Sequence, residues 1–506
     1  MVARINTVSF QGIEPLAIDV QVQITTGIPS FSIVGLPDKA VAESRERVRA
    51  ALHSLGLALP PKRIIVNLSP ADIQKEGSHY DLPIALGLLV ALEVLPFEEV
   101  HQYVALGELA LDGRISSISG VLPAALHASS QGQGLICPEP CGKEAAWAPE
   151  IDILAPSTLL ALINHFKGLQ LLPRPSPGVT ENSHHAFDLI DVKGQETAKR
   201  AFEIAAAGGH NLLLMGPPGA GKSMLAARLP GLLPPLEPEE ALEVTMIHSI
   251  AGKLPEGTLI KQRPYRDPHH SASLPALVGG GFKALPGEVT LAHRGVLFLD
   301  ELPEFSRSTL ESLRQPLETG QVTIARANAH ITYPARFQLI AAMNPCRCGY
   351  LDEVSKACSR APKCAVDYQA KISGPLLDRI DFHVFTPAVK PLELALLSGK
   401  ESTETVAERV AKARLWQRQR FLKKIPNSSS RVNAEASGKE LEAILQIEEE
   451  SQGLLNQAAE KLRFSARSYH RLLRVARTIA DLGESETIRK IDMAEALSLR
   501  LNSLTT

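Results

Sequence analysis

The chain has 506 residues, which is too long for one ordinary hydrophobic core and indicates about two to four domains. Its formal net charge of −2 excludes a protein that is basic over its whole surface, although a local or assembled basic surface stays open. The N-terminus lacks a secretory pattern, and the longest apolar run, Leu82 to Leu92, is too short to span a membrane. We therefore expect a soluble cytoplasmic protein without a membrane partner.

Residues 1–170 combine strand-like and helix-like patterns. The alternating segment 18–24 and the β-branched segment 63–68 predict strands, and the periodicity of 38–56 predicts an amphipathic helix. Prolines spaced through the polar segment 171–185 then predict an interdomain linker. The sequence thus indicates an α/β domain followed by a flexible connection.

Three apolar runs between residues 186 and 390 predict strands, at 210–215, 295–300 and 337–344. Helical patterns separate them, which is typical of a parallel sheet covered by helices. The first run leads into GPPGAGKS, the spacing of a phosphate-binding loop between a strand and a helix. The predicted nucleotide-binding residues are Gly216, Pro217, Pro218, Gly219, Ala220, Gly221, Lys222, Ser223 and Asp300.

The chemistry of this loop predicts binding of ATP and Mg²⁺. Its glycines let backbone N–H groups approach phosphates, Lys222 reaches the β- and γ-phosphates, and the Ser223 hydroxyl binds the magnesium ion. Asp300 and Glu301 follow the second strand, where the first can hold Mg²⁺ and the second can activate water. Asn344 ends the third strand and is interpreted as a polar sensor, although asparagine there is also a common turn residue.

The segment 319–340 predicts a hairpin, because two β-like arms flank the turn ANA. Arg326, Asn328 and His330 would project from it just before the third strand. Such a hairpin can contact a nucleic acid, and the alternative is a purely structural contact between subunits.

A cysteine-rich insertion at 344–371 predicts a structural zinc site, because four thiolates can close a tetrahedral site and order a short loop. The six cysteines form two groups, namely Cys137 and Cys141, and Cys346, Cys348, Cys358 and Cys364. The first pair is interpreted as buried thiols. The spacing of the second group differs from paired CxxC motifs, so four unconnected thiols are the alternative. The insertion is also basic and could contact phosphates.

The segments 263–273, 286–305, 332–346 and 373–381 are similar to the ComM/YifB family, in the magnesium-chelatase-like branch of the AAA+ ATPases. The resemblance covers essentially the whole chain. It implies an AAA+ core at 186–390, a helical lid at 391–506 and a ring of six identical subunits with active sites at their junctions.

Two arginines match functional positions of that family. Arg379 matches the arginine finger that reaches a neighbour's γ-phosphate, and Arg467 matches the second sensor of the lid. The alternative for Arg379 is a pair with Asp378 or Asp381 of its own chain. In the predicted helix after Ser465, Leu472, Val475, Ala476 and Ile479 share one face, whereas Arg471 and Arg474 are interpreted as a solvated face.

The segments 69–86 and 107–126 resemble the proteolytic domain of Lon. Asp81 and Leu122 stand in the regions of its serine nucleophile and lysine base, and neither can replace those groups. Ser78 lies nearby, but the second segment contains no lysine. We therefore expect residues 1–170 to form a Lon-like domain without peptidase activity.

The resemblance implies a DNA motor, a helicase or branch-migration enzyme acting in homologous strand exchange during natural transformation. In related motors a hairpin here points into the pore, so six copies of Arg326 would give a basic channel for single-stranded or branched DNA. Recombination proteins are the expected further partners. The alternatives are a protein-remodelling unfoldase or Lon-like machine and, less favoured, the motor subunit of a magnesium chelatase.

Overall fold

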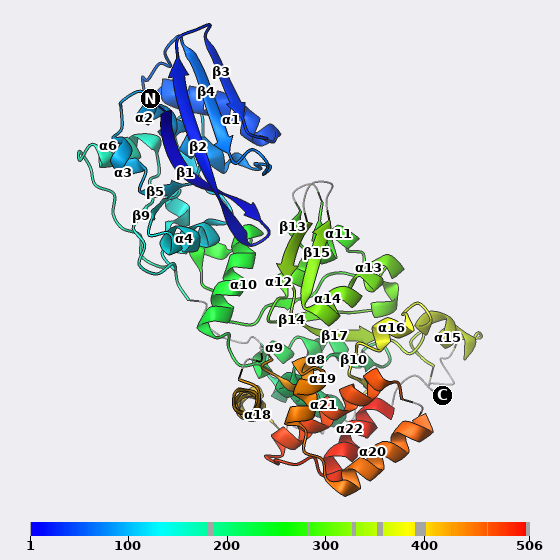
Figure 1. Ribbon diagram of the computed structural model, residues 1–506. Helices are drawn as coiled ribbons and strands as arrows, with labels where there is room; N and C mark the ends of the chain where they lie inside the picture. The colour runs from blue at the N-terminus through cyan, green and yellow to red at the C-terminus, as the bar shows by residue number, and fades with distance from the viewer. Residues whose placement is uncertain are drawn as a thin grey trace.

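A computed structural model describes residues 2–180, 187–281, 284–325, 330–351, 358–389, 401–426, 428, 430–462 and 464–501. Two sheets organise these residues, one in the N-terminal part and one in the nucleotide-binding part (Figure 1). None of the helices in these ranges is long and apolar enough to cross a membrane.

The N-terminal sheet has seven strands in the order β3-β4-β2-β1-β5-β8-β9. Its strands are β1 (Val2–Gln11), β2 (Glu14–Thr25), β3 (Ser30–Val34), β4 (Arg63–Ser69), β5 (Tyr103–Ala105), β8 (Gly134–Ile136) and β9 (Ile153–Leu154), with β6 (Glu108–Leu109) and β7 (Ile115–Ser116) as a separate pair. Its helices are α1 (Lys39–Ser54), α2 (Asp81–Ala91), α3 (Phe97–Val100), α4 (Val121–Ser130), α5 (Gly142–Ala145) and α6 (Leu159–Phe166). The predicted strands and helix are confirmed as β2, β4 and α1.

A helix cap and the pattern of burial explain α1, β2 and α2. Asp38 caps α1 by accepting a hydrogen bond from the Val41 amide, and alternate residues of β2 are buried. The apolar run that begins at Leu82 forms α2, which is buried against β1 and β2. Cys137 and Cys141 are buried thiols, as predicted.

The second sheet has five parallel strands in the order β11-β14-β17-β10-β18. They are β10 (Leu212–Met215), β11 (Tyr265–Arg266), β14 (Val296–Leu299), β17 (Gln338–Met343) and β18 (Phe382–Phe385). Alternate side chains enter two different cores, with Phe298 and Ile340 on one face and Leu297 and Leu339 on the other. The predicted α/β sheet and its three predicted strands, β10, β14 and β17, are therefore confirmed.

Helices cover both faces of this sheet and two small hairpins extend from it (Figure 1). The helices are α7 (Glu196–Gly208), α8 (Lys222–Ala226), α9 (Leu229–Leu232), α10 (Pro238–Ile250), α11 (Leu274–Val278), α12 (Glu288–Leu291), α13 (Arg307–Ser312), α14 (Arg314–Thr319), α15 (Lys363–Gln369) and α16 (Gly374–Leu377). The hairpins are β12 (Gly279–Gly280) with β13 (Leu285–Pro286), and β15 (Gln321–Ala325) with β16 (His330–Pro334).

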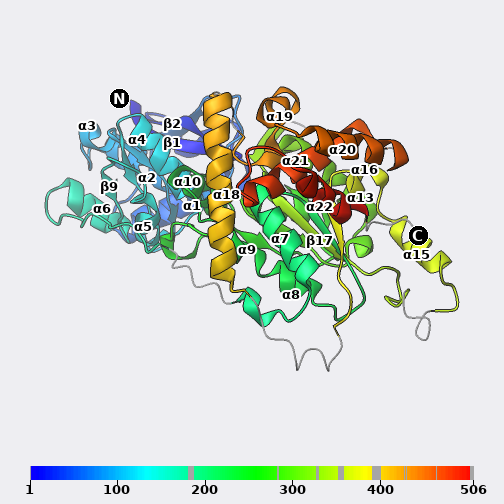
Figure 2. The same ribbon diagram turned by 90° about the horizontal axis from the view of Figure 1, so that it is seen from below.

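The C-terminal helices pack on the α7 side of the sheet, and the long α18 stands along one flank (Figure 2). They are α18 (Thr403–Lys424), α19 (Gly438–Ile444), α20 (Glu449–Leu462), α21 (Ala466–Leu482) and α22 (Lys490–Leu501). As predicted, Ser465 caps α21, and the face that carries Leu472 and Ile479 is buried in the core.

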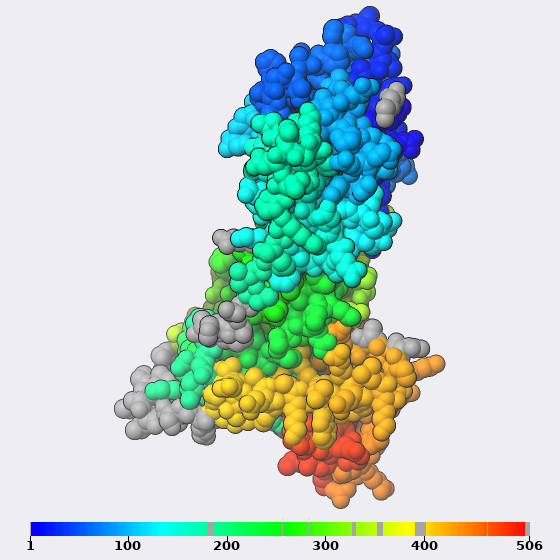
Figure 3. Space-filling view, turned by 90° about the vertical axis from the view of Figure 1, so that its left-hand side faces the viewer, coloured from blue at the N-terminus to red at the C-terminus, as the bar shows by residue number. Residues whose placement is uncertain are grey.

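The N-terminal part rests on α10, which belongs to the insertion between Lys222 and Asp300 (Figure 3). The Trp147 indole N–H donates to the Gly257 carbonyl over 2.8 Å, and its ring packs on an apolar patch. That patch consists of Leu236, Ala241, Val244 and Leu259. The Ser249 hydroxyl donates to the buried Glu144 carboxylate. The two parts therefore share a packed contact with buried polar groups.

Two further contacts join these parts. The predicted linker lies against both, because Gly178 N–H donates to the Lys143 carbonyl and Thr180 forms a bridge with Leu259. At the turn between β1 and β2, the Gln11 amide donates to the His330 carbonyl over 3.4 Å. The described part of the linker is thus held in place, and the β1–β2 turn touches the hairpin of β15 and β16.

Candidate nucleotide-binding site

The loop between β10 and α8 has the backbone of a phosphate cradle. Gly219 and Gly221 have φ angles of +75° and +82°, which glycine adopts with little strain. A Cβ atom on Gly219 would meet nothing within 4 Å, whereas one on Gly216 would lie 2.1 Å from the Thr386 carbonyl oxygen. The loop is therefore packed at its strand end and open at Gly219, where phosphates would approach.

Lys222 projects into this loop from the first turn of α8. Its ammonium group donates to the carbonyls of Gly216 and Pro217 over 2.8 and 3.0 Å, and to the Asn344 side-chain oxygen over 3.1 Å. Burial lowers the pKa of Lys222, and the Asp300 and Glu301 carboxylates oppose that shift. Phosphate oxygens would offer stronger, charged acceptors to the same ammonium group, so the loop fits a nucleotide.

Ser223 and Asp300 meet beside the lysine. The Ser223 hydroxyl donates to the Asp300 carboxylate over 2.6 Å, and that carboxylate also accepts the Glu301 backbone N–H over 2.8 Å. A hydroxyl and a carboxylate at one point are oxygen ligands of the kind that Mg²⁺ takes beside substrate phosphates. The structure therefore brings together Lys222, Ser223, Asp300 and Asn344 as the sequence predicts, from β10, β14 and β17.

Glu301 begins the turn after β14 and has a left-handed backbone, with φ at +51°. Its carboxylate lies 3.2 Å from Nδ1 of His270, a residue of the loop between β11 and α11. Sequence reasoning missed this histidine, because the segment 263–273 carried only a family resemblance. The contact places His270, from the loop after the neighbouring strand β11, where it can position the Glu301 side chain.

We expect His270→Ala to lower kcat about tenfold while leaving ATP affinity unchanged, because loss of a positioning contact disturbs the carboxylate and not the phosphate loop. His270→Asn, which keeps a hydrogen-bond donor, should recover part of the rate. Steady-state phosphate release and equilibrium nucleotide binding measure the two effects. His53→Ala is the matched control, since His53 is an exposed histidine on α1 of the N-terminal part. An unchanged kcat in His270→Ala would rule out the positioning role.

Arg379 and Arg467 converge on one carboxylate, that of Glu318 at the end of α14. The Arg379 guanidinium is buried and also donates to the carbonyls of Arg314 and Pro375, over 3.2 and 2.5 Å. Arg467 is half exposed and lies 3.0 Å from Glu318. The guanidinium of Arg379 is therefore held within its own chain.

Two alternatives from the sequence are wrong. Glu318, and not Asp378 or Asp381, is the carboxylate that pairs with Arg379. The face carrying Arg471 and Arg474 is not solvated: Arg471 is largely buried and lies 3.2 Å from Asp381, and burial lowers the pKa of Arg474. The helical periodicity correctly grouped these residues on one face of α21, but that face packs against the ATPase sheet instead of facing solvent.

Glu318 lies at the opposite edge of the sheet from the phosphate loop. The Gly320 carbonyl, which follows Glu318 closely in the chain, accepts a hydrogen bond from the N–H of Ala335, shortly before β17. The Arg379 carbonyl accepts a hydrogen bond from the side chain of Asn211, which lies just before β10. Lys222 and Asn344 follow the carboxyl ends of the same strands. The strand β17 alone spans roughly 20 Å, so neither arginine reaches the phosphate loop of its own chain.

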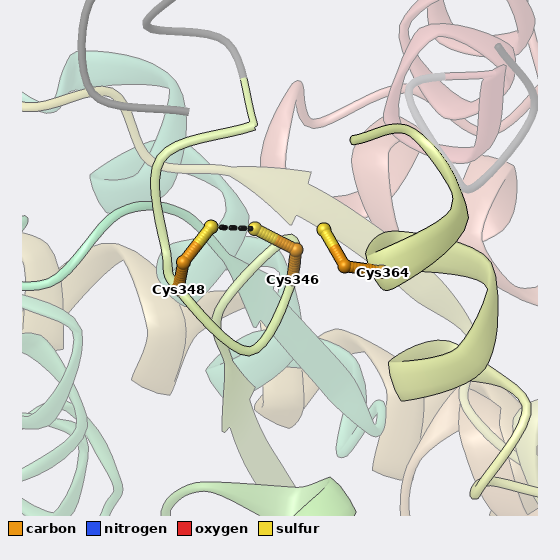
Figure 4. A group of neighbouring side chains, drawn as sticks. All are labelled: Cys346, Cys348 and Cys364. Atoms are coloured by element: carbon orange, nitrogen blue, oxygen red, sulfur yellow. Dashed lines mark hydrogen bonds between the residues drawn. The ribbon is translucent and has the colours of Figure 1, made fainter. Parts of the chain in front are cut away.

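The cysteine insertion brings its thiols together (Figure 4). The sulfur atoms of Cys346 and Cys348 lie 3.1 Å apart, those of Cys358 and Cys364 lie 3.2 Å apart, and those of Cys346, Cys348 and Cys364 lie within 4.8 Å of one another. Such a donor set fits a tetrahedral thiolate zinc site. Residues 352–357 of the insertion lie outside the described residues.

This insertion also packs against the phosphate loop. Gly349 has a φ angle of +84°, and a Cβ atom on it would lie 2.4 Å from Cδ of Pro218. Only glycine fits this close approach without displacing the proline. The cysteine group therefore sits directly beside the nucleotide-binding loop.

We expect the purified protein to contain one zinc ion per chain and to lose it in Cys358→Ser combined with Cys364→Ser, because two ligands cannot hold a structural zinc ion. Elemental analysis of the dialysed proteins measures this. Cys137→Ser combined with Cys141→Ser is the matched control and should keep the metal. A metal-free but fully folded wild-type protein would contradict the zinc assignment.

The predicted hairpin is confirmed in its arms, since β15 and β16 pair antiparallel with Ala325 opposite His330. His330 is exposed, whereas Arg326 and Asn328 lie outside the described residues. The Tyr333 hydroxyl donates to the Ala284 carbonyl over 2.9 Å and so ties this hairpin to the one formed by β12 and β13. Two linked hairpins thus project from the same side of the sheet (Figure 1).

The N-terminal segments compared with Lon lack a serine–lysine pair in the described residues. The Ser78 hydroxyl donates to the Glu108 carboxylate, and the Lys75 ammonium donates to the Ile73 carbonyl over 2.7 Å. Asp81 is fully buried and paired with Arg47 over 2.6 Å, and Leu122 is fully buried. Each polar group here is engaged in a contact other than activation of a serine by a lysine.

Three family profiles match the sequence: "Magnesium chelatase, subunit ChlI" at residues 188–394, "Subunit ChlI of Mg-chelatase" at 20–140, and "Magnesium chelatase, subunit ChlI C-terminal" at 400–500. The mixed α/β architecture and its parallel sheet agree with the fold of a magnesium-chelatase-like AAA+ protein.

Several individual proteins are similar to the chain. The competence protein ComM of Haemophilus influenzae is 42% identical over 97% of this chain and 95% of its own length. The uncharacterized protein YifB of Escherichia coli is 43% identical over 98% of this chain and 96% of its own length. The DNA replication licensing factor mcm7 of Xenopus tropicalis is 25% identical over 40% of this chain and 24% of its own length.

Proposed function

Because the chain belongs to the ComM/YifB family of magnesium-chelatase-like AAA+ proteins, we propose that it is an ATP-hydrolysing ring motor that moves DNA. The observation that carries the ATPase is the meeting of Lys222, Asn344, Ser223 and Asp300 at the carboxyl ends of three adjacent parallel strands. That edge is where open α/β sheets bind nucleotides.

Each residue of the nucleotide site has a proposed role in ATP hydrolysis. Lys222 and the loop N–H groups bind the phosphates, while Mg²⁺ held by Ser223 and Asp300 would neutralise phosphate charge. Glu301 accepts a proton from the attacking water, and Asn344 orients that water against the γ-phosphate. His270 keeps the Glu301 carboxylate in place.

A ring of six chains accounts for the position of the two arginines. Arg379 and Arg467 lie at the sheet edge away from Lys222, so they can act only on a nucleotide bound by another chain. A neighbour docked against that edge would present its phosphate loop to both guanidiniums. There Arg379 would leave Glu318 and stabilise the charge of the transition state as an arginine finger.

DNA is the proposed polymer. One relative is named a competence protein and another a DNA replication licensing factor, which supports a role in homologous strand exchange during transformation and contact with recombination proteins. In a ring, the linked hairpins would line the pore with Arg326, Asn328 and His330. Residues 1–170 would form a non-proteolytic Lon-like domain, residues 186–390 the ATPase core and residues 391–506 the lid.

A protein-remodelling machine is the second candidate. The contact of Gln11 with the His330 carbonyl favours this candidate, because the contact joins the N-terminal domain to the hairpin that would face the pore. A threaded polypeptide would then pass both parts in turn. The two candidates differ in the polymer that stimulates ATP hydrolysis.

We expect DNA to stimulate ATP hydrolysis, and the assembled protein to move a labelled three-way or four-way junction with ATP and Mg²⁺. Binding should tolerate changes of sequence and weaken steeply with salt, because phosphate contacts release counterions. ATPase rates with single-stranded, duplex and branched DNA measure the stimulation.

Arg326→Ala should remove stimulation and junction movement while keeping the basal rate, and Arg45→Ala on the exposed N-terminal surface is the matched control. If the assembled protein neither binds DNA at low salt nor moves the junction, the DNA motor is wrong. Stimulation by an unfolded polypeptide would then favour the second candidate.

A further inference from the structure

A cavity of about 770 Å³ opens between the ATPase sheet and the lid. One wall comes from residues that precede β10, β14 and β17, and the other comes from α18, α21 and the segment 430–437. Its volume lies in the range of small-ligand sites. Because the cavity borders the amino ends of the strands, it faces away from the phosphate loop of the same chain.

Arginine dominates the lining of this cavity, with nine arginines against six carboxylates. Six of the nine lie within ion-pair distance of a carboxylate, as Arg263 does with Glu240 and Arg471 with Asp381. Among the described residues, Arg336, Arg414 and Arg474 have no carboxylate at that distance. The cavity therefore holds three guanidiniums that form no ion pair with its own carboxylates.

Arg414, on α18, is the most desolvated of the three guanidiniums. Its Nε donates to the Ala206 carbonyl over 2.8 Å. Burial and the charge of nearby Arg263 lower the pKa of Arg414 to about 9, although the Glu435 and Glu240 carboxylates oppose that shift. A desolvated guanidinium without a paired carboxylate is unfavourable, so an anion bound in the cavity would stabilise it.

Arg474, on α21, gives a similar indication from a second helix of the lid. Its Nε is buried and has no hydrogen-bond partner among the described residues, and the same holds for the Nε of Arg471 beside it. Burial lowers the pKa of Arg474, the Asp381 carboxylate opposes this shift, and the charge of Arg471 adds to it. The cavity wall thus offers unused N–H donors on guanidinium groups.

We propose that this cavity is a second anion site, which binds a ligand carrying several phosphates through Arg336, Arg414 and Arg474. Guanidinium groups donate paired hydrogen bonds that match phosphate oxygens, and an oligophosphate carries enough negative charge to neutralise three of them. Nucleotides and inorganic polyphosphate share this chemistry. Arg467 also lines the cavity, where it is paired with Glu318, whereas Arg379 is not among the lining residues. The proposed ligand of these two arginines belongs to a neighbouring chain.

Occupation of the site has a structural consequence. Arg336 lies just before β17 of the sheet, whereas Arg414 and Arg474 belong to the lid. A ligand that contacts all three guanidiniums would connect the lid to the sheet at the edge where a neighbouring chain would dock. The site therefore gives a phosphate compound a way to fix the lid independently of the phosphate loop.

The test uses the full-length protein with Lys222→Ala, which disables the phosphate loop, and titrates it with tripolyphosphate by calorimetry. We expect one binding event per chain and a rise in Tm. Adding Arg414→Gln and Arg474→Gln should weaken this binding at least about tenfold, because each charge-assisted hydrogen bond to phosphate is strong. Arg45→Gln with Arg114→Gln, both exposed and distant, is the matched control and should change nothing.

Arg336→Gln gives an independent variant, because Arg336 is exposed and its replacement leaves the buried arginines in place. It should also weaken tripolyphosphate binding, with Tm unchanged in the absence of ligand. Parallel titrations with ATP and with short polyphosphate chains distinguish the two sources of the ligand. This test involves no DNA, so its outcome is separate from that of the DNA motor.

Three results would overturn the second site. Absence of tripolyphosphate binding in Lys222→Ala would show that the phosphate loop is the sole site. Equal affinity in the arginine variants and in the control would place the bound anion elsewhere. A change of oligomeric state in Arg414→Gln with Arg474→Gln, without any anion binding, would instead assign the cavity to the neighbouring chain.

Discussion

Lys222→Ala is expected to abolish ATP binding, whereas Glu301→Gln should bind ATP normally and hydrolyse it at least about 100-fold more slowly. The two residues act at different points, since Lys222 lies among the acceptors of the phosphate loop and Glu301 lies beyond Asp300, where water would attack. Equilibrium binding of a fluorescent nucleotide and steady-state phosphate release separate the two effects.

Lys261→Ala is the matched control for the first variant, because Lys261 is an exposed lysine of the same part of the chain. It should bind and hydrolyse ATP like the wild type. Equal ATP affinity in the wild type and Lys222→Ala would contradict the assignment of the phosphate loop. Normal turnover in Glu301→Gln would require a different residue to activate the water.

Arg379→Ala should lower turnover about 1000-fold, the lower end of the range for an arginine finger. The rate should partly return when this variant is mixed with Lys222→Ala chains. In such mixed rings, a junction can combine the intact phosphate loop of one chain with the intact Arg379 of the other. Phosphate release, measured across mixing ratios with co-assembly verified, tests this complementation.

Arg379 is buried against Glu318, so its loss can also weaken the fold. A Tm measurement separates instability from lost catalysis, and Arg314→Ala removes a neighbouring, more exposed guanidinium as a control. Absence of any rescue in verified mixed rings would mean that Arg379 acts within its own chain.

The phosphate loop and its strands could be predicted because their signals are local. Strand β10, the glycine turn and Lys222 follow one another in the chain, and the loop requires glycine where φ is positive or backbone approaches closely. Asp300 and Asn344 were placed correctly for a related reason: parallel strands end at one edge, so residues that follow them meet.

Contacts between distant segments could not be predicted in the same way. His270 meets Glu301 across two strands, and Glu318 meets Arg379 across 61 positions of sequence. No spacing encodes either pair. The face of Arg471 and Arg474 shows the related limit of helical periodicity, which groups residues on one side of a helix without telling what lies opposite.

The Trp147 contact bears on where this chain can be divided. A fragment beginning at residue 186 would keep α10 but lose Trp147, which covers Leu236, Val244 and Leu259. Exposed apolar patches of this kind promote non-specific association. Fragments of the N-terminal part would in turn leave Glu144 without its donor from Ser249. Expression of either part by itself therefore requires polar substitutions at the contact between the N-terminal part and α10, and the intact chain is the better choice for purification.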